Sequence, residues 1–268
     1  MRRVSSIALA AIMIAIVLAL AACGNGEPEA TNPEFAPNQT AEAYIYIHGG
    51  YVGFATARTN AQGEVSVELD EAFLPHTLAA VDIDAEEWNE DNTAWYVVRG
   101  NQNYVAKYVE YNGATYVGTT VGTSVTYVAA DEDGNPSGGQ DLELIIVRDQ
   151  DSMANYVESI QNGGFGIMTG FGDTAQPVTT TAYGQVTKRG SSYWNFGLGW
   201  QGNIDAIEAF IDENGWNFNI ADMNRAEEPN EDDQRLWSVA DAVTGATLSD
   251  FPDYFLNAQM ALTQLERN

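Results

Sequence analysis

The sequence predicts an α+β protein in which helices pack against antiparallel β-sheet. Short stretches rich in Tyr, Val and Thr are separated by glycine- and asparagine-containing turns, as strands in hairpins are. Longer stretches repeat apolar residues at helical spacing. The expected strands cover residues 44–48, 51–58, 64–70, 94–98, 104–111, 115–118 and 124–129, with a further buried strand at 141–147.

Three helices are expected, and each has one apolar face. The first covers residues 152–161, the second covers residues 203–214 and is ended by Gly215, and the third opens between Ser249 and Pro252. Proline is tolerated in the first turn of a helix, so Pro252 is compatible with that start. The residues expected to face the core are Met153, Tyr156, Val157 and Ile160 in the first helix, Ile204, Ile207, Phe210 and Ile211 in the second, and Tyr254, Phe255, Ala258, Ala261, Leu262 and Leu265 in the third.

The first residues have the pattern of a secretory signal peptide. Two arginines precede an uncharged apolar run over residues 7–20, which is too short for a membrane-spanning helix. The run leads into Leu20-Ala21-Ala22-Cys23, which resembles the bacterial lipobox. This resemblance implies cleavage after residue 22 and lipidation of Cys23, which would anchor the protein to the cell membrane on its extracytoplasmic side. Cys23 is the sole cysteine, so no internal disulfide is expected.

The chain divides into three parts. Residues 1–22 form the lipoprotein signal peptide, and residues 23–40 contain the lipidated cysteine and a polar, proline-containing tether. Residues 41–268 form the folded part, which is long enough to bury a large core. We expect one domain, with two closely fused lobes as the alternative.

The charge of the chain excludes some partners. Its formal net charge is −27, and loss of Arg2 and Arg3 with the signal peptide leaves 9 basic against 38 acidic residues, a balance of −29. Nucleic acids and anionic lipid surfaces are bound through clusters of Lys and Arg. We therefore expect no nucleic-acid partner, and membrane attachment only through the lipid.

Two segments suggest ligand sites but lack the required spacing. Residues 131–135 are acidic, yet they lack the register and the distal Glu of an EF-hand. Residues 165–172 are rich in glycine, yet no strand-turn-helix unit of the dinucleotide-binding type surrounds them. We expect a solvated turn at the first and a bend or close backbone approach at the second, and no metal site.

The most specific motif precedes the last helix. It reads Asp241-Ala242-Val243-Thr244-Gly245-Ala246-Thr247, or D-x-x-[ST]-G-A-[ST]. It resembles the flavinylation motif of the FMN-binding domain family, found in subunits of ion-pumping NADH and ferredoxin oxidoreductases and in secreted flavin lipoproteins. The resemblance implies an FMN-binding-domain-like fold and FMN joined to Thr247 through a phosphoester bond. It also implies maturation by a separate Mg-dependent flavin transferase.

The residues of the motif are compatible with this role. A threonine hydroxyl is a poor nucleophile without an adjacent base, and both histidines are distant in sequence, so activation would come from the transferase. Gly245 and Ala246 leave room for that enzyme, and Asp241 is the residue that resembles the family's invariant acid. The alternative is a plain loop with Thr as a helix cap.

The same tripeptide occurs a second time, at Gly113-Ala114-Thr115. There Asn112-Gly113 lies between alternating aromatic and β-branched residues, which is typical of a hairpin turn. The position that corresponds to Asp241 is Val109. The sequence therefore predicts a turn at this copy and an attachment motif at the other.

Aromatic residues near the motif are candidates for contact with the flavin ring. An isoalloxazine needs an apolar, aromatic-lined slot, which Trp194, Phe196, Trp200 or Trp237 could supply, and the alternative for each is an ordinary core position. The N-terminus of the last helix faces the motif and could receive the FMN phosphate, since helix N-termini attract anions.

Together these features predict an extracytoplasmic electron carrier with covalent FMN, rather than a stand-alone enzyme with catalytic side chains. The resemblance implies a membrane donor such as an NADH dehydrogenase or quinol, and an acceptor such as soluble flavin, a metal oxide or a terminal reductase. One alternative is a β-rich surface-binding lipoprotein without cofactor. Another is a flavin reductase that binds FMN noncovalently.

Overall fold

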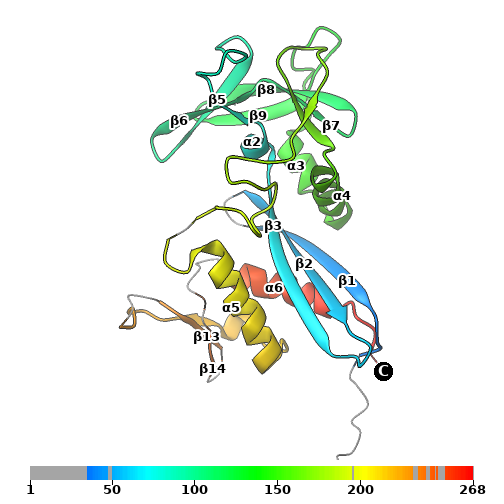
Figure 1. Cartoon of the computed structure of the whole chain (residues 1–268), viewed down its shortest axis with the longest axis vertical. Helices are drawn as coiled ribbons and strands as arrows, with labels where there is room; N and C mark the ends of the chain where they lie inside the picture. Colours follow the sequence, from blue (N-terminus) through cyan, green and yellow to red (C-terminus); the bar gives the residue numbers. More distant parts are fainter. Residues whose placement is uncertain are drawn as a thin grey trace, which may run out of the picture.

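The computed structural model describes residues 35–47, 50–194, 196–231, 235–239, 242–244, 246 and 251–267. The chain is mixed α and β, with antiparallel sheets and few helices (Figure 1). The predicted signal peptide, Cys23 and most of the tether lie outside the described residues. Three residues of the motif, Asp241, Gly245 and Thr247, lie outside them as well.

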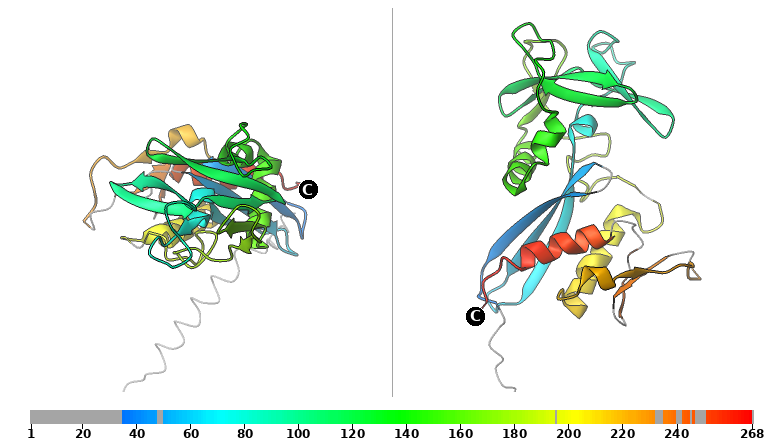
Figure 2. Two further views of the ribbon diagram at one scale, coloured as in Figure 1. Left: turned by 90° about the horizontal axis from the view of Figure 1, so that it is seen from above. Right: turned by 180° about the vertical axis from the view of Figure 1, so that it is seen from behind.

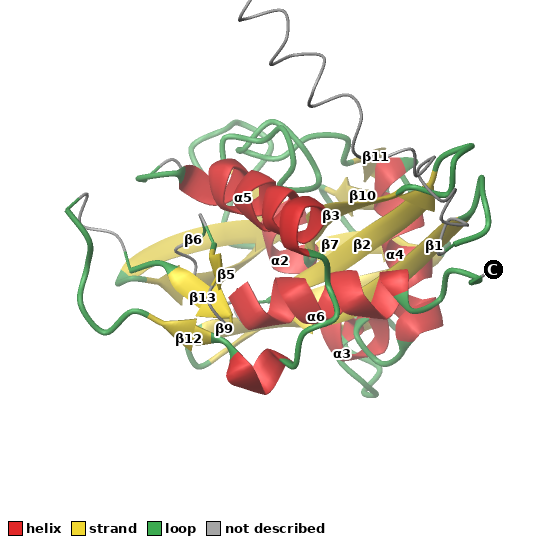
Figure 3. Cartoon of the chain, turned by 90° about the horizontal axis from the view of Figure 1, so that it is seen from below, coloured by secondary structure: helices red, strands yellow, loops and turns green. Residues whose placement is uncertain are grey.

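A three-stranded antiparallel sheet forms the centre of the molecule. Its strands are β1 (Thr40–Ile47), β2 (Tyr51–Thr59) and β3 (Val65–Phe73), in that order. Helix α6 (Phe251–Leu262) packs against all three strands, and α5 (Gly199–Asn214) packs against β3 beside it (Figure 3). Both helices bury the apolar faces that their spacing predicted, so this sheet face and the two helices enclose one hydrophobic core.

A second lobe is inserted into this arrangement. The chain leaves the sheet after Phe73 and returns at Val186, where the Phe73 N–H donates to the Val186 carbonyl (3.2 Å). Ala72 then pairs with Thr187 in an antiparallel bridge. We call residues 74–185 the inserted lobe and the remaining described residues the motif lobe. Because the two ends of the insertion meet, the inserted lobe projects from one end of the central sheet (Figures 1 and 2).

The inserted lobe has its own sheets and its own core. One sheet has the order β11-β10-β7-β8-β9 and the other the order β4-β6-β5. The α4 helix buries the four residues that its spacing predicted and packs against β1. The elements are α2 (Pro75–Leu78), β4 (Ala80–Val81), β5 (Thr93–Val98), β6 (Asn101–Ala106), β7 (Tyr108–Tyr111), β8 (Ala114–Val121), β9 (Ser124–Ala129), α3 (Leu142–Ile146), α4 (Gln150–Gln161), β10 (Phe165–Met168) and β11 (Gln176–Pro177).

The predicted hairpin turn at the second Gly-Ala-Thr is confirmed. Asn112 and Gly113 join β7 to β8 and have φ angles of 51° and 73°. A two-residue hairpin loop with both angles positive is the type I′ turn that Asn-Gly favours. Ala114 and Thr115 are strand residues, so this tripeptide has a structural explanation of its own.

The predicted strand at residues 141–147 is wrong, because the segment is the short helix α3. The Asp141 carboxylate accepts a hydrogen bond from the Glu143 N–H (2.8 Å) and so caps the helix. Leu142 and Ile146 are four residues apart and both buried, which is helical spacing. An apolar run this short does not distinguish a buried strand from a helix.

The single strand predicted over residues 104–111 is two strands. The chain changes sheets at Lys107, whose N–H donates to the Asn92 carbonyl (2.9 Å) and whose carbonyl accepts from the Gly118 N–H (2.6 Å). β6 therefore pairs with β5, whereas β7 pairs with β8 and β10. Sequence alternation continues through Lys107 and gives no sign of this change of partner.

Several boundaries also differ from the prediction. Helix α5 begins at Gly199, four residues earlier than expected, and ends as predicted at Gly215, which has a φ of 77°. Phe35, expected in the tether, is buried and forms a bridge with Arg267, and the Ala36 N–H donates to the Glu266 carbonyl (3.0 Å). The described fold therefore begins several residues before the predicted start at residue 41.

Candidate functional site

The described part of the motif lies in or directly after the last strand of a small sheet that precedes α6 in the chain. Its strands are β12 (Asn224–Arg225), β13 (Trp237–Val239) and β14 (Ala242–Val243), and β13 and β14 form an antiparallel pair. The Thr244 N–H donates to the Trp237 carbonyl (2.7 Å), and the Trp237 N–H donates to the Ala246 carbonyl (3.2 Å). Both backbone groups of Trp237, its N–H and its carbonyl, are thus hydrogen-bonded to residues of the motif.

Thr244 has a structural role within the motif. Its side chain is buried, and its hydroxyl oxygen accepts a hydrogen bond from the Ala246 N–H (3.2 Å). Ala246 is fully buried in the same core as α5 and α6. The Thr244 hydroxyl is therefore not accessible to another protein in this fold.

Trp237 connects the motif to α6. Its ring stacks on that of Phe251, with 5.7 Å between centroids and 18° between planes. Phe251 is the first residue of α6 and is fully buried. Because Trp237 itself is only half-buried, part of its ring lies open beside the motif.

Trp200 lies elsewhere in the same core. It is 1% exposed, and its indole N–H donates to the Tyr254 hydroxyl (3.2 Å). This hydrogen bond joins the first turn of α5 to the first turn of α6. Trp200 is thus a core residue that brings two helix N-termini together, and no open face of its ring is available to a ligand.

The loop before α5 carries exposed apolar side chains. Trp194 is 39% exposed, Phe196 75% and Leu198 41%. The backbone of Trp194 has a φ of 48°, a region that bulky residues seldom occupy and that often marks a functional segment. Leu198 is the N-cap position of α5, yet no side chain caps that helix and no acidic residue lies in its first turn.

A pocket of about 310 Å³ adjoins the motif sheet on the side of β12 and β13. Its lining includes Arg225, Leu236 and Ser238. The sequence did not indicate this pocket, because Arg225 and Leu236 are separated by an acidic loop and meet only through the pairing of β12 with β13. Glu228 also lines the pocket, so it is bordered by one cationic and one anionic side chain.

A buried ion pair lies at the junction of the two lobes, and sequence reasoning missed it. The Lys188 ammonium contacts the Glu71 carboxylate, and both side chains are almost fully buried. The Tyr254 hydroxyl donates to Glu71 Oε1 (2.6 Å). Lys188 Nζ lies 3.3 Å from the ring centroid of Tyr51 and 4.3 Å from that of Tyr193. These cation–π contacts replace part of the hydration that the ammonium loses.

Ionisable groups next to this pair are also buried. Burial raises the pKa of Asp70 to about 6, although hydrogen bonds from Thr187 and from the Arg189 and Glu71 N–H groups favour its charged form. Burial raises the pKa of Glu208 as well, and this carboxylate is paired with Arg189. The only hint in the sequence was the adjacent cations Lys188 and Arg189 in a chain with few basic residues.

The described residues show neither a cluster of metal ligands nor a membrane-spanning helix. No group of three or more His, Cys, Asp or Glu side chains among them is placed to hold a metal ion. No helix in the described ranges is long and apolar enough to cross a membrane. Comparisons with protein-family models, with curated proteins and with solved structures found no match for this chain.

Proposed function

We propose that this chain is a lipid-anchored, extracytoplasmic electron-transfer protein that carries FMN covalently on Thr247. The observation that carries the proposal is the motif over residues 241–247. Two of its described residues, Thr244 and Ala246, are buried, and their backbone groups are hydrogen-bonded to those of Trp237. These contacts support the proposal because they attach the described part of the motif to the folded core.

The surroundings of the motif are suited to FMN. The half-buried ring of Trp237 offers an aromatic surface next to the motif backbone. The first turn of α5, which has no side-chain cap and no acidic residue, lies beside that of α6. A helix N-terminus stabilises a nearby anion by roughly 0.3 to 1 kcal/mol when exposed, and this would favour the FMN phosphate.

In this proposal FMN supplies one- and two-electron transfer, and the protein supplies position and electrostatics. Thr247 provides the attachment oxygen, and Thr244 keeps the preceding turn closed. Trp237 and the exposed Trp194 and Phe196 provide aromatic surface that excludes water from the ring. Trp200 acts indirectly, by fixing the start of α5 against α6.

The proposed location and partners follow from the N-terminal pattern and the resemblance. Lipid on Cys23 would hold the protein at the outer face of the cell membrane, since two or more acyl chains anchor stably. The donor would be a membrane NADH dehydrogenase or quinol, and the acceptor a soluble flavin or a reductase. A flavin transferase would attach the cofactor.

The test is the colour of the purified protein after denaturation. We expect yellow protein from a host with the transferase, with a flavin absorbance that remains on the chain after guanidinium treatment and gel filtration. Flavin released by the denaturant would instead indicate noncovalent binding. Colourless protein from that host would favour the alternative of a surface-binding lipoprotein without cofactor.

A further inference from the structure

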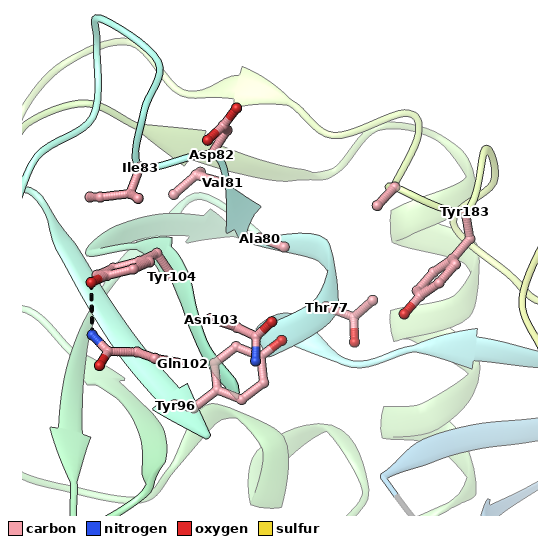
Figure 4. A pocket seen from close by; sticks show the side chains of 11 residues that line it. Thr77, Ala80, Val81, Asp82, Ile83, Tyr96, Gln102, Asn103, Tyr104 and Tyr183 are labelled. Carbon is pink, nitrogen blue, oxygen red and sulfur yellow. Dashed lines mark hydrogen bonds between the residues drawn. The ribbon is translucent and has the colours of Figure 1, made fainter. Parts of the chain in front are cut away.

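The inserted lobe contains a pocket that the proposed electron-transfer function does not use. It has a volume of about 350 Å³ and adjoins α2, β4, β5, β6 and the loop over residues 178–185. Four of its lining residues direct polar groups towards one common space, and we call them the polar cluster (Figure 4). They are Thr77, Tyr96, Asn103 and Tyr183.

The fold brings the polar cluster together from three places in the chain. Tyr96 and Asn103 are direct partners across β5 and β6, so their side chains leave the same face of this strand pair. Thr77 lies on α2, which directly precedes β4, and β4 pairs with β6 on its other side. Tyr183 comes from the loop over residues 178–185. Strand register and chain direction thus place these side chains at one site.

Contacts outside the pocket fix the two tyrosine rings. The Tyr183 ring stacks on Phe73, with 5.4 Å between centroids, and the Tyr96 ring meets His76 edge to face at 5.7 Å. Burial raises the pKa of Tyr96, and the nearby Tyr183 and Glu143 raise it further. This influence agrees with Figure 4, in which Tyr96 and Tyr183 approach the same space. The two phenol groups are therefore in position before a ligand arrives.

The hydrogen-bonding groups of the polar cluster are largely unused within the protein. In the part of the chain that the structure describes, the hydroxyls of Thr77, Tyr96 and Tyr183 form no hydrogen bond with another residue. The Asn103 amide N–H donates to the Asn101 carbonyl (3.0 Å), and its amide oxygen has no partner among the described residues. A hydroxyl both donates and accepts, and an amide oxygen accepts. The cluster therefore offers donors and acceptors to a ligand.

No charged side chain belongs to the polar cluster. Asp82 is the one charged residue among the described residues that line the pocket, and it is directed away from Tyr96 and Tyr183 (Figure 4). An anion would find no cation here and would be repelled by a chain with a formal net charge of −27. A cation would find hydroxyl and amide groups in place of a carboxylate, and an apolar ligand would leave those groups unpaired. The cluster thus matches a neutral ligand with several hydroxyl groups.

We propose that the polar cluster binds a neutral sugar through one pyranose ring. The sugar hydroxyls exchange hydrogen bonds with the hydroxyls of Thr77, Tyr96 and Tyr183 and with the Asn103 amide. The volume of about 350 Å³ lies at the lower end of the range for small-molecule pockets and suits a single sugar ring. This site does not depend on flavin attachment, because none of its residues belongs to the motif.

The test is ligand-observed NMR titration of the mature, full-length protein without flavin. The probes are the methyl glycosides of glucose, galactose, mannose and N-acetylglucosamine, and the uronic acid and amino sugar that match the best of these. We expect saturable binding of at least one neutral glycoside. Both charged analogues should bind at least about tenfold more weakly, because a charge without a partner costs more than a lost neutral hydrogen bond.

The contradicting results are equally clear. Failure of all four glycosides to bind, or tighter binding of the uronic acid or the amino sugar than of the neutral glycoside, would overturn the proposal. Protein that carries flavin should bind the sugar equally well. The sugar proposal and the flavin proposal therefore stand or fall separately.

Hydroxyl deletions sharpen the test. Tyr96→Phe keeps the ring beside His76, Tyr183→Phe keeps the ring on Phe73, and each should weaken sugar binding about 2- to 10-fold, the range for loss of one hydrogen bond. The matched control is Tyr104→Phe, which removes a hydroxyl of the same pocket that is directed away from the cluster (Figure 4). It should change the affinity by less than about twofold. If Tyr104→Phe weakens binding as much as Tyr96→Phe, the assignment of the cluster is wrong.

Discussion

Helices α3 and α4 of the inserted lobe and helix α5 of the motif lobe begin in different ways. In the inserted lobe, α3 and α4 begin with Asp141 and Asp149, whose carboxylates accept hydrogen bonds from backbone N–H groups of the first turn. In the motif lobe, α5 begins at Leu198 without a side-chain cap. Capping satisfies N–H groups that the helix leaves unpaired. The carboxylates of Asp141 and Asp149 thus cap α3 and α4, whereas in α5 the Gly199 and Trp200 N–H groups donate to the Phe196 (2.9 Å) and Trp194 (3.1 Å) carbonyls of the preceding loop.

The lobes also differ in where they place charge. The core of the inserted lobe is mostly aliphatic with some buried tyrosines, and the hydroxyls of Tyr127 and Tyr156 each donate to a backbone carbonyl. The buried charges Glu71 and Lys188 belong instead to the motif lobe, on β3 and on the segment that returns to it from the inserted lobe. Burying an ion pair gains little stability compared with apolar residues, but removing one partner is costly. This pair therefore fixes how the insertion is joined to the sheet.

The largest effect is expected from breaking that pair. Lys188→Met leaves Glu71 as an uncompensated buried carboxylate and should lower the free energy of unfolding by about 3 to 5 kcal/mol. Combining it with Glu71→Gln removes the stranded charge, so the double variant should recover a large part of the loss. Urea unfolding of the two single variants and the double variant measures this. If the losses in free energy of unfolding of the two single variants add up in the double variant, Lys188 and Glu71 do not interact directly.

The second prediction concerns pH and Asp70. Its folded pKa is raised from 3.8 to about 6, so the folded state binds this proton more tightly than the unfolded state does. Stability from this group therefore falls as pH rises through the window from about 4 to 6, by up to about 3 kcal/mol. Asp70→Asn should remove that part of the slope. The measurement is urea unfolding of both proteins at several pH values from 4 to 7. If the free energy of unfolding changes with pH in the same way in both proteins, Asp70 does not titrate in this window.

The third prediction concerns α3, a helix whose N-terminus is capped by a side chain. Asp141→Ala removes the cap of α3 and should cost about 1 kcal/mol, without effect on flavin attachment. Asp141→Asn retains a capping oxygen and should be close to the parent protein. Thermal unfolding gives the stability change. A reduced flavin content in Asp141→Ala would show that the inserted lobe influences the motif.

The fourth prediction concerns α5, a helix without a side-chain cap, where we expect the change to affect flavin attachment. Leu198→Asp places a carboxylate at the exposed, uncapped start of α5 and should raise stability by up to about 1 kcal/mol. It should slow flavin attachment roughly two- to fivefold, because it opposes an anion at that N-terminus by about 0.3 to 1 kcal/mol. Leu198→Asn is the neutral control. Equal labelling rates for the two variants would rule out a role of this N-terminus in receiving the phosphate.

The sequence predicted the parts of the fold that depend on local pattern. The stripes of α4, α5 and α6 repeat with helical period, and Asn112-Gly113 has the residues that a type I′ turn needs. The short apolar run at 141–147 failed because strand and helix both explain its composition.

The unpredicted features depend on contacts between distant segments. Nothing near Phe73 indicates that its backbone meets Val186, and nothing in the single sequence pairs Glu71 with Lys188. The same holds for the pocket in the inserted lobe, since Tyr96 and Tyr183 come from separate segments. In the motif, by contrast, the residues are consecutive, so the sequence alone was enough to propose them as a candidate site.

The most direct test of the central proposal is to locate the flavin on the chain. The protein would be coexpressed with a flavin transferase, digested and analysed by peptide mass spectrometry, together with Thr247→Ala, Thr247→Ser and the control Thr115→Ala at the other Gly-Ala-Thr. We predict an FMN adduct on Thr247 that is lost in Thr247→Ala, retained at least in part in Thr247→Ser and unchanged in Thr115→Ala. An adduct on Thr244 or Thr115, or undiminished labelling of Thr247→Ala, would contradict the account.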